Sequence, residues 1–80
     1  MTTEQLRAAH RATPFRPFKI RMADGRAFPV PHPDFLSISP AGRTVVIYQP
    51  DGAASIVDLL LMTELEWSPP GEPATAGDQG

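Results

Sequence analysis

The sequence predicts a small α+β protein in which one short helix precedes an antiparallel sheet. Apolar residues at helical spacing occupy the first part of the chain, and this pattern ends at Pro14. Segments that alternate apolar and polar residues follow, joined by short loops ending in Gly25, Gly42 and Gly52. Strands joined by such short loops pair in antiparallel fashion. We therefore expect a meander of four to five strands within one domain, residues 1–67.

Residues 2–12 are expected to form the helix. Thr2 followed by Gln5 fits a capping box, in which each side chain bonds to the backbone of the other residue. Leu6 should anchor the helix on the sheet, because a helix this short is not stable alone. Pro14 ends the helix, since the residue before a proline disfavours the helical conformation.

The segment from Phe18 to Val30 is predicted to form the first hairpin. A three-residue loop ending at Gly25 pairs Ile20 with Phe28 and Phe18 with Val30, which gathers the apolar side chains on one face. A loop of two residues would place the apolar sets of the two strands on opposite faces. The longer loop, with glycine in the left-handed conformation, is therefore expected.

Two further three-residue loops, ending at Gly42 and Gly52, predict the register of the next strands. The same reasoning pairs Leu36 with Val46, and Val46 with Ile56. It likewise opposes position 35 to position 47, and position 47 to position 55. The central strand of this group is apolar on both faces, so one face should meet the core. The other face should meet the helix or a second subunit, which predicts a homo-oligomer.

The last part of the ordered chain permits two interpretations. Ala54 to Val57 reads as a strand, Asp58 begins a helical turn, and alternation up to Trp67 indicates a final strand. A helix over residues 57–66 is the competing interpretation, because leucine, methionine and glutamate are good helix formers. We prefer the strand. Residues 68–80 contain no large apolar residue and are predicted to be a disordered tail.

Three prolines after the first hairpin, Pro29, Pro31 and Pro33, indicate a bend, because proline cannot donate to a sheet ladder. A meander with a bent second strand and a helix in front can close into a small barrel of the SH3-like or Sm-like kind. An open, curled sheet is the alternative.

Several motifs resemble those of a group of short uncharacterised bacterial proteins. They are Pro14-Phe-Arg-Pro-Phe18, Ala23-Asp-Gly-Arg26, His32-Pro33, Ser39-Pro-Ala-Gly-Arg-Thr-Val-Val46, Pro50-Asp-Gly52 and Asp58-Leu59. The resemblance covers residues 14–67 and implies no activity. Met22-Ala-Asp-Gly-Arg26 is also similar, more weakly, to the first strand and turn of Sm-like proteins. Their Arg-Gly-Asp or Arg-Gly-Asn triplet is absent near Val57-Asp58-Leu59, so RNA binding is not carried over.

Composition and charge narrow the classes of function. The 80 residues carry a net charge of −2 and include no cysteine, so a disulfide framework is excluded and a cytoplasmic protein is expected. No segment resembles a signal peptide or reaches the length of a membrane span, so we expect no membrane partner. All seven basic residues lie at or before Arg43, and most acidic residues lie after it. We expect the two halves to pair with each other, and we therefore expect no nucleic-acid partner.

Four residues are candidates for a binding site. Phe15 could belong to an aromatic rim, although large aromatic residues in a small domain usually fill the core. His32 is the histidine placed to act as a base for a serine on the sheet. Its alternative role is a polar group at a strand end, bonded to backbone or solvent. Arg16 and Arg43 are basic residues of the motifs above.

Neither spacing nor composition indicates a catalytic, cofactor or metal site. We therefore expect a protein that is not an enzyme, and that acts as a protein-interaction or regulatory module with an unknown protein partner. The alternative function is that of a ring-forming, Sm-like RNA-binding protein.

Overall fold

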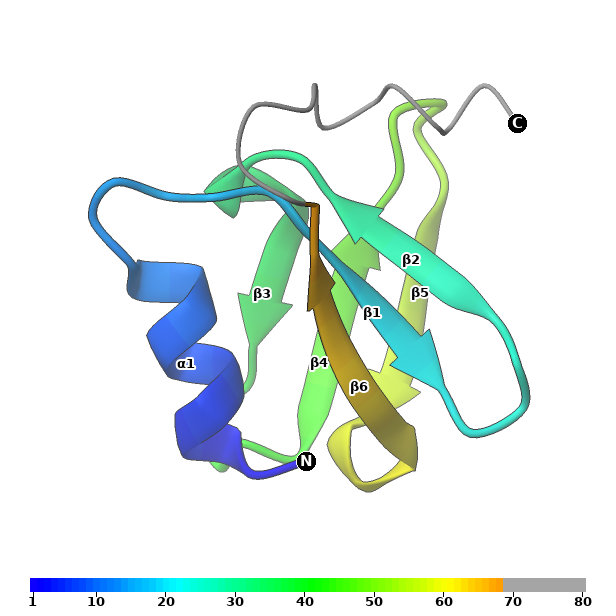
Figure 1. Cartoon of the computed structure of the whole chain (residues 1–80). Helices are drawn as coiled ribbons and strands as arrows, with labels where there is room; N and C mark the ends of the chain where they lie inside the picture. Colours follow the sequence, from blue (N-terminus) through cyan, green and yellow to red (C-terminus); the bar gives the residue numbers. More distant parts are fainter. Residues whose placement is uncertain (69–80) are drawn as a thin grey trace.

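The computed structural model describes residues 1–68 (Figure 1). The predicted disordered tail, apart from Ser68, lies outside the described residues. Helix α1 (Thr3–Arg11) begins with the expected capping box. The Thr2 hydroxyl accepts from the Gln5 backbone N–H at 3.1 Å, and the Gln5 side chain accepts from the Thr2 N–H at 3.0 Å.

Residues 1–68 contain six strands in two antiparallel sheets of three strands each (Figure 1). The first sheet has the order β2-β1-β6, with the bounds Ala27–Val30, Phe18–Met22 and Met62–Trp67. The second has the order β3-β4-β5, with the bounds Leu36–Ile38, Thr44–Tyr48 and Ala54–Asp58. The predicted α+β class, a helix followed by antiparallel strands, is confirmed. In this part of the chain, no strand of one sheet pairs with a strand of the other.

The strand count exceeds the predicted four to five because the bent second strand is divided. A short 3-10 helix, η1 (Pro33–Phe35), separates β2 from β3. Proline fixes its own backbone and lacks an N–H, so the proline-rich stretch ends one ladder before the next begins.

Two of the three predicted registers are confirmed. Ile20 pairs with Phe28 across the first hairpin, and Val46 pairs with Ile56 across the third. Each loop closes on a glycine of positive φ: 94° at Gly25 and also at Gly52.

The predicted register between β3 and β4 is wrong by one residue. Leu36 pairs with Ile47 rather than Val46, because the loop contains four residues and closes between Ser39 and Thr44. The Ser39 N–H donates to the Thr44 carbonyl oxygen at 2.9 Å, and the Ser39 hydroxyl accepts from the Thr44 N–H at 3.2 Å. The observed register opposes two buried apolar residues on the core face, whereas the predicted one would have opposed Leu36 to a residue of the outer face.

The final segment forms a strand, as preferred. A second 3-10 helix, η2 (Leu59–Leu61), precedes β6, so the competing long helix does not form. β6 lies beside β1 with Lys19 opposite Glu66 and Arg21 opposite Glu64, so basic residues of the first strand lie beside acidic residues of the last strand.

The core lies between the two sheets and α1. Its buried members come from every element except η1: Leu6, Ala9, Phe18, Ile20, Met22, Phe28, Val30, Leu36, Val45, Ile47, Val57, Leu59 and Met62. Within residues 1–68, no helix is both long enough and apolar enough to span a membrane.

Three side chains fix α1 beside the ends of β3. Thr3 Oγ1 donates to the Gly42 carbonyl oxygen at 2.9 Å, and Arg7 Nη2 donates to the Ser39 carbonyl oxygen at 3.1 Å. His10 Nε2 donates to the Pro33 carbonyl oxygen at 2.9 Å. Residues spaced by three or four share one helix face, so the face that carries Thr3, Arg7 and His10 contacts the second sheet and its loops. Another face of α1 is left toward β6.

Candidate functional site

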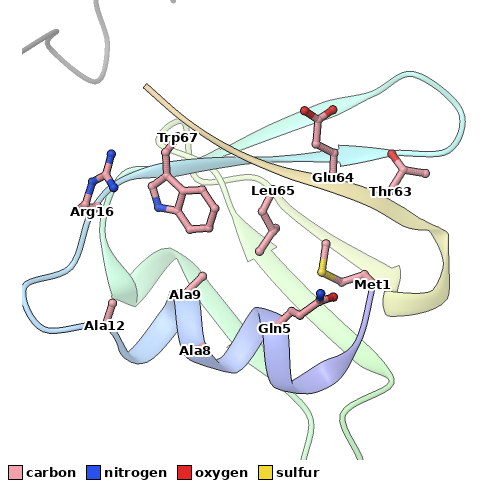
Figure 2. Close-up of a pocket in the computed structure, with 10 residues that line it drawn as sticks. All are labelled: Met1, Gln5, Ala8, Ala9, Ala12, Arg16, Thr63, Glu64, Leu65 and Trp67. Carbon is pink, nitrogen blue, oxygen red and sulfur yellow. The ribbon is translucent and has the colours of Figure 1, made fainter. Parts of the chain in front are cut away.

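The candidate site is a groove between α1 and β6, with a volume of about 690 Å³ (Figure 2). Gln5, Ala8, Ala9 and Ala12 line its helix side. Thr63, Glu64, Leu65 and Trp67 line its strand side, and Met1 and Arg16 complete it. The lining is mainly apolar, as expected of a surface that takes an apolar partner.

Small residues on the helix make room for the groove. Ala8 and Ala12 are one helical turn apart and line the same wall, so neither fills the space in front of β6. Leu6, on the core side of α1, is fully buried and holds the helix in place. The helix is therefore anchored through one face, while a neighbouring face carries small side chains that leave space in front of β6.

On the strand side of the groove, Leu65 and Trp67 are alternate residues of β6 and share one face. Figure 2 shows the Leu65 and Trp67 side chains directed toward α1, and the Glu64 carboxylate directed away from it. Trp67 remains 39% exposed, and its ring centroid lies 5.7 Å from that of Phe18. A tryptophan held by a core aromatic ring but still exposed is a common anchor in binding surfaces.

The backbone of β6 also faces the groove. The Met22 N–H donates to the Arg26 carbonyl oxygen at 2.8 Å, so even-numbered residues of β1 bond toward β2. Lys19 then bonds toward β6, opposite Glu66. The backbone groups of Leu65, the adjacent residue, point away from β1. Among residues 1–68, no backbone hydrogen bond outside the sheet reaches them.

Arg16 is the one sequence-predicted site residue that lies in the groove. It sits near Trp67, and its Nη2 donates to the Ser68 carbonyl oxygen at 3.2 Å (Figure 2). A guanidinium has five N–H donors, so this contact leaves donors for a further group.

The other three candidates lie elsewhere, with structural partners. The Phe15 ring packs against the core, 5.8 Å from the Phe18 ring centroid. His32 Nδ1 accepts from the Asp34 N–H at 3.3 Å and thereby caps η1. This is the strand-end role that was weighed against a catalytic one for His32.

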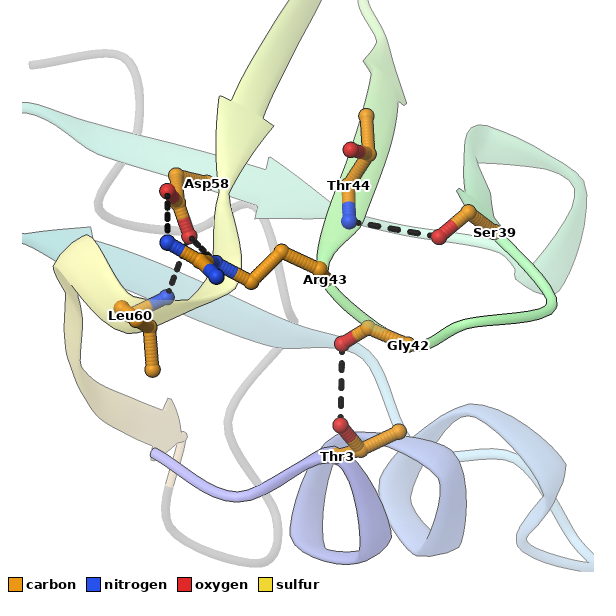
Figure 3. A network of polar contacts seen from close by, with 7 residues as sticks. All are labelled: Thr3, Ser39, Gly42, Arg43, Thr44, Asp58 and Leu60. Atoms are coloured by element: carbon orange, nitrogen blue, oxygen red, sulfur yellow. Dashed lines mark hydrogen bonds and ion pairs between the residues drawn. The ribbon is translucent and has the colours of Figure 1, made fainter.

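Arg43, the fourth candidate, is held by Asp58 (Figure 3). Arg43 Nε donates to Asp58 Oδ1 at 3.0 Å, and Nη2 donates to Oδ2 at 3.3 Å. Asp58 Oδ1 also accepts from the Leu60 N–H at 2.9 Å, which caps η2. The side-chain hydrogen bond from Arg43, followed by the backbone bond from Leu60, lowers the pKa of the Asp58 carboxyl.

Metal chemistry finds no support in the described part of the chain. Residues 1–68 hold no group of three or more histidine, aspartate or glutamate side chains placed to bind a metal ion.

Sequence reasoning missed most of the groove. The alternation ending at Trp67 was recognised as a strand, but not as a wall of a site. The signal that could have found the groove is the pair Ala8 and Ala12, small residues one turn apart on a helix that must pack against a sheet.

Comparisons of the chain with models of protein families, with curated proteins and with solved structures return no match.

Proposed function

We propose that the protein is a non-catalytic interaction module whose groove between α1 and β6 binds an extended segment of a partner protein. The observation that carries this proposal is that one edge of β6, which pairs with no second strand among residues 1–68, lies along an apolar groove. The β6 backbone offers hydrogen bonds to an added strand, while Leu65 and Trp67 offer apolar contact beside them. Binding by strand addition combines these two features.

The groove geometry favours an extended occupant over a helical one. Successive outward backbone groups on β6 are two residues apart, which is the repeat of a strand. Alternate side chains of an added strand would point between Trp67 and the alanines of α1, and the others would point to solvent. Small and medium apolar residues at the inward positions fit the space that Ala8 and Ala12 leave.

Charge at one end of the groove adds to the proposed specificity. Arg16 lies beside Trp67, so a carboxylate of the partner segment at that end would meet a guanidinium that makes one hydrogen bond within residues 1–68. The segment that we propose is therefore extended and apolar at alternate positions, with an acidic group at the Trp67 end.

A cytoplasmic location is part of the proposal. The chain has no cysteine to form the disulfides common in small secreted domains. That the protein is not an enzyme stays a prediction.

Selection from a displayed random peptide library on the full chain tests the proposed function. Trp67 is the single tryptophan, so a selected peptide bound in the groove should change the intrinsic fluorescence. We expect Ala8→Phe to reduce affinity at least tenfold by filling the groove. Ala41→Phe, the same change at an exposed loop position outside the groove, should leave affinity unchanged. Failure to select any peptide that Ala8→Phe displaces would contradict the proposal.

A further inference from the structure

The edge of β5 is a second surface open to a partner. β5 pairs only with β4 among the described strands, and Ile56 at its centre is 73% exposed. An unpaired strand edge with a central exposed apolar residue is a site where another strand can add.

The other three sheet edges each carry a feature that hinders strand addition by a second copy. β2 contains Pro29, which has no N–H to donate. β3 spans three residues, which is short for a ladder, and α1 lies alongside it. β6 is flanked by α1 across the groove. The sequence of β5, Ala-Ser-Ile-Val-Asp, contains neither proline nor a basic residue.

The backbone of Ile56 points toward the open edge. The Gln49 N–H donates to the Ala53 carbonyl oxygen at 2.8 Å at the start of the β4–β5 ladder. In an antiparallel pair the bonded positions recur every two residues, so Ser55 and Val57 bond to β4. Ala54, Ile56 and Asp58 therefore direct their backbone groups away from the sheet.

We propose that two copies of the chain pair through this edge, with β5 running antiparallel to β5 of the second copy about a two-fold axis at Ile56. In this register Ile56 meets its own copy, and Ala54 meets Asp58 of the second copy. All five residues overlap, and the two Asp58 carboxylates stay apart. The contact is isologous, as two-fold symmetry requires.

The side chains of the outer face support the same pairing. Val46 lies beside Ile56 in the ladder, and Tyr48 follows two residues later on the same face. Pairing would join this strip to its symmetry mate in one continuous six-stranded sheet. Asp58 is already neutralised by Arg43 within its own copy, so placing it at the interface does not add an unpaired charge.

A second copy is the occupant that these observations favour over an unrelated protein. When two copies of an antiparallel strand edge are related by a two-fold axis at the central residue, the backbone donors of each copy lie opposite the acceptors of the other. The register centred on Ile56 also avoids any contact between like charges. The paired segment is short, so we expect association that depends on concentration rather than a permanent dimer.

Light scattering and sedimentation of the full chain at increasing concentration test the proposal. The average mass should rise from the monomer value of 8.7 kDa toward twice that value. Ile56→Lys should abolish the rise, because it places two lysines together on the axis. Ser37→Lys adds the same charge on the same face at the far strand, β3, and should associate as the unmodified chain does.

Hydrogen exchange provides a second readout in the unmodified chain. Exchange of the Ile56 amide should slow as concentration rises, whereas that of Gly25, at the tip of the β1–β2 loop, should not change. Circular dichroism confirms that each variant is folded. A mass that stays at the monomer value, association that survives Ile56→Lys, or association that Ser37→Lys abolishes would each overturn pairing through the β5 edge.

Discussion

Arg21 on β1 and Glu66 on β6 form an ion pair across the first sheet, with Arg21 Nη2 2.9 Å from Glu66 Oε1. Glu64 lies farther from the same guanidinium, with Oε1 3.8 Å from Nε. These side chains are between two-fifths and three-fifths exposed, so the pair contributes little to stability. The pair places carboxylates beside the Arg21 guanidinium, which would otherwise be open to a phosphate group.

The first prediction follows from this pairing. We expect no sub-micromolar binding of a labelled single-stranded RNA at low salt, measured by fluorescence anisotropy. Glu66→Gln should raise the affinity, because it frees Arg21, and the gain should diminish as salt increases. Glu4→Gln makes the same charge change on α1 and should have less effect. Strong, salt-sensitive binding by the unmodified chain would instead favour the ring-forming RNA-binding alternative.

The second prediction concerns the anchor of α1. Leu6 is fully buried, so Leu6→Ala should lower the free energy of unfolding by about 2–5 kcal/mol in urea titrations. Leu60→Ala is the matched control: the same change at a position that is 61% exposed should cost less than about 0.5 kcal/mol. Equal effects at the two positions would mean that α1 does not dock through Leu6.

Much of the fold could be predicted because the alternation of apolar residues and the lengths of the glycine loops indicated the same strand pairing. The register of the first hairpin followed from the requirement that Ile20 and Phe28 share a face. A single loop length satisfied both this requirement and the position of Gly25. The register of the third hairpin, with Val46 opposite Ile56, followed in the same way from the loop ending at Gly52. In these cases periodicity and turn chemistry indicated the same arrangement.

The β3–β4 register could not be predicted in the same way, because tertiary contacts decide the loop length. The Ser39 hydroxyl accepts from the Thr44 N–H, and the Arg43 carbonyl oxygen accepts from the Leu59 N–H at 2.8 Å. The first contact closes the four-residue loop, and the second bonds Arg43 to the start of η2. One of them involves η2, which is distant in sequence, so no local pattern reports it.

The groove was harder still to predict, because it is a space between elements. Its existence depends on the separation of α1 from β6. That separation is set by side chains bonded on another face of the helix, such as Thr3 and His10. A sequence pattern identifies which residues face inward, but not how far apart two elements stand. Arg16 was found as a basic residue of a motif, without its neighbour Trp67.

The third prediction is a pH dependence at Asp58, whose pKa the folded structure lowers from its usual 3.8. A carboxyl with a lowered folded pKa contributes stability above its unfolded pKa, and that contribution is lost as pH falls through the folded value. The unmodified chain should therefore melt at a higher temperature than Asp58→Asn at pH 7. The difference should shrink as the pH falls below about 4, near the unfolded carboxyl pKa.

Arg43→Gln provides the control for this prediction, because it removes the largest cause of the lowered pKa. In that background, Asp58→Asn should change the melting temperature less at pH 7, with a weaker pH dependence. If the melting temperatures of the unmodified chain and of Asp58→Asn differ by the same amount at every pH, the charge of Asp58 does not contribute to stability.

The fourth prediction compares two glycines of positive φ that differ in their surroundings. Gly25 has a φ of 94° and open space where a Cβ would stand, so Gly25→Ala should cost roughly 1 kcal/mol, through backbone strain alone. At Gly42, with a φ of 80°, an added Cβ would lie 2.5 Å from Thr3 Cγ2. Relieving that contact displaces the Thr3 hydroxyl from the Gly42 carbonyl oxygen, a further loss of roughly 1 kcal/mol. Urea unfolding of both variants, alone and with Thr3→Ala, measures the difference. With Thr3→Ala present the gap between the two glycine variants should narrow, because only the contact with the Cβ of residue 3, at 3.1 Å, remains at Gly42. A gap that does not narrow would rule out the Thr3 hydroxyl and methyl groups as its cause.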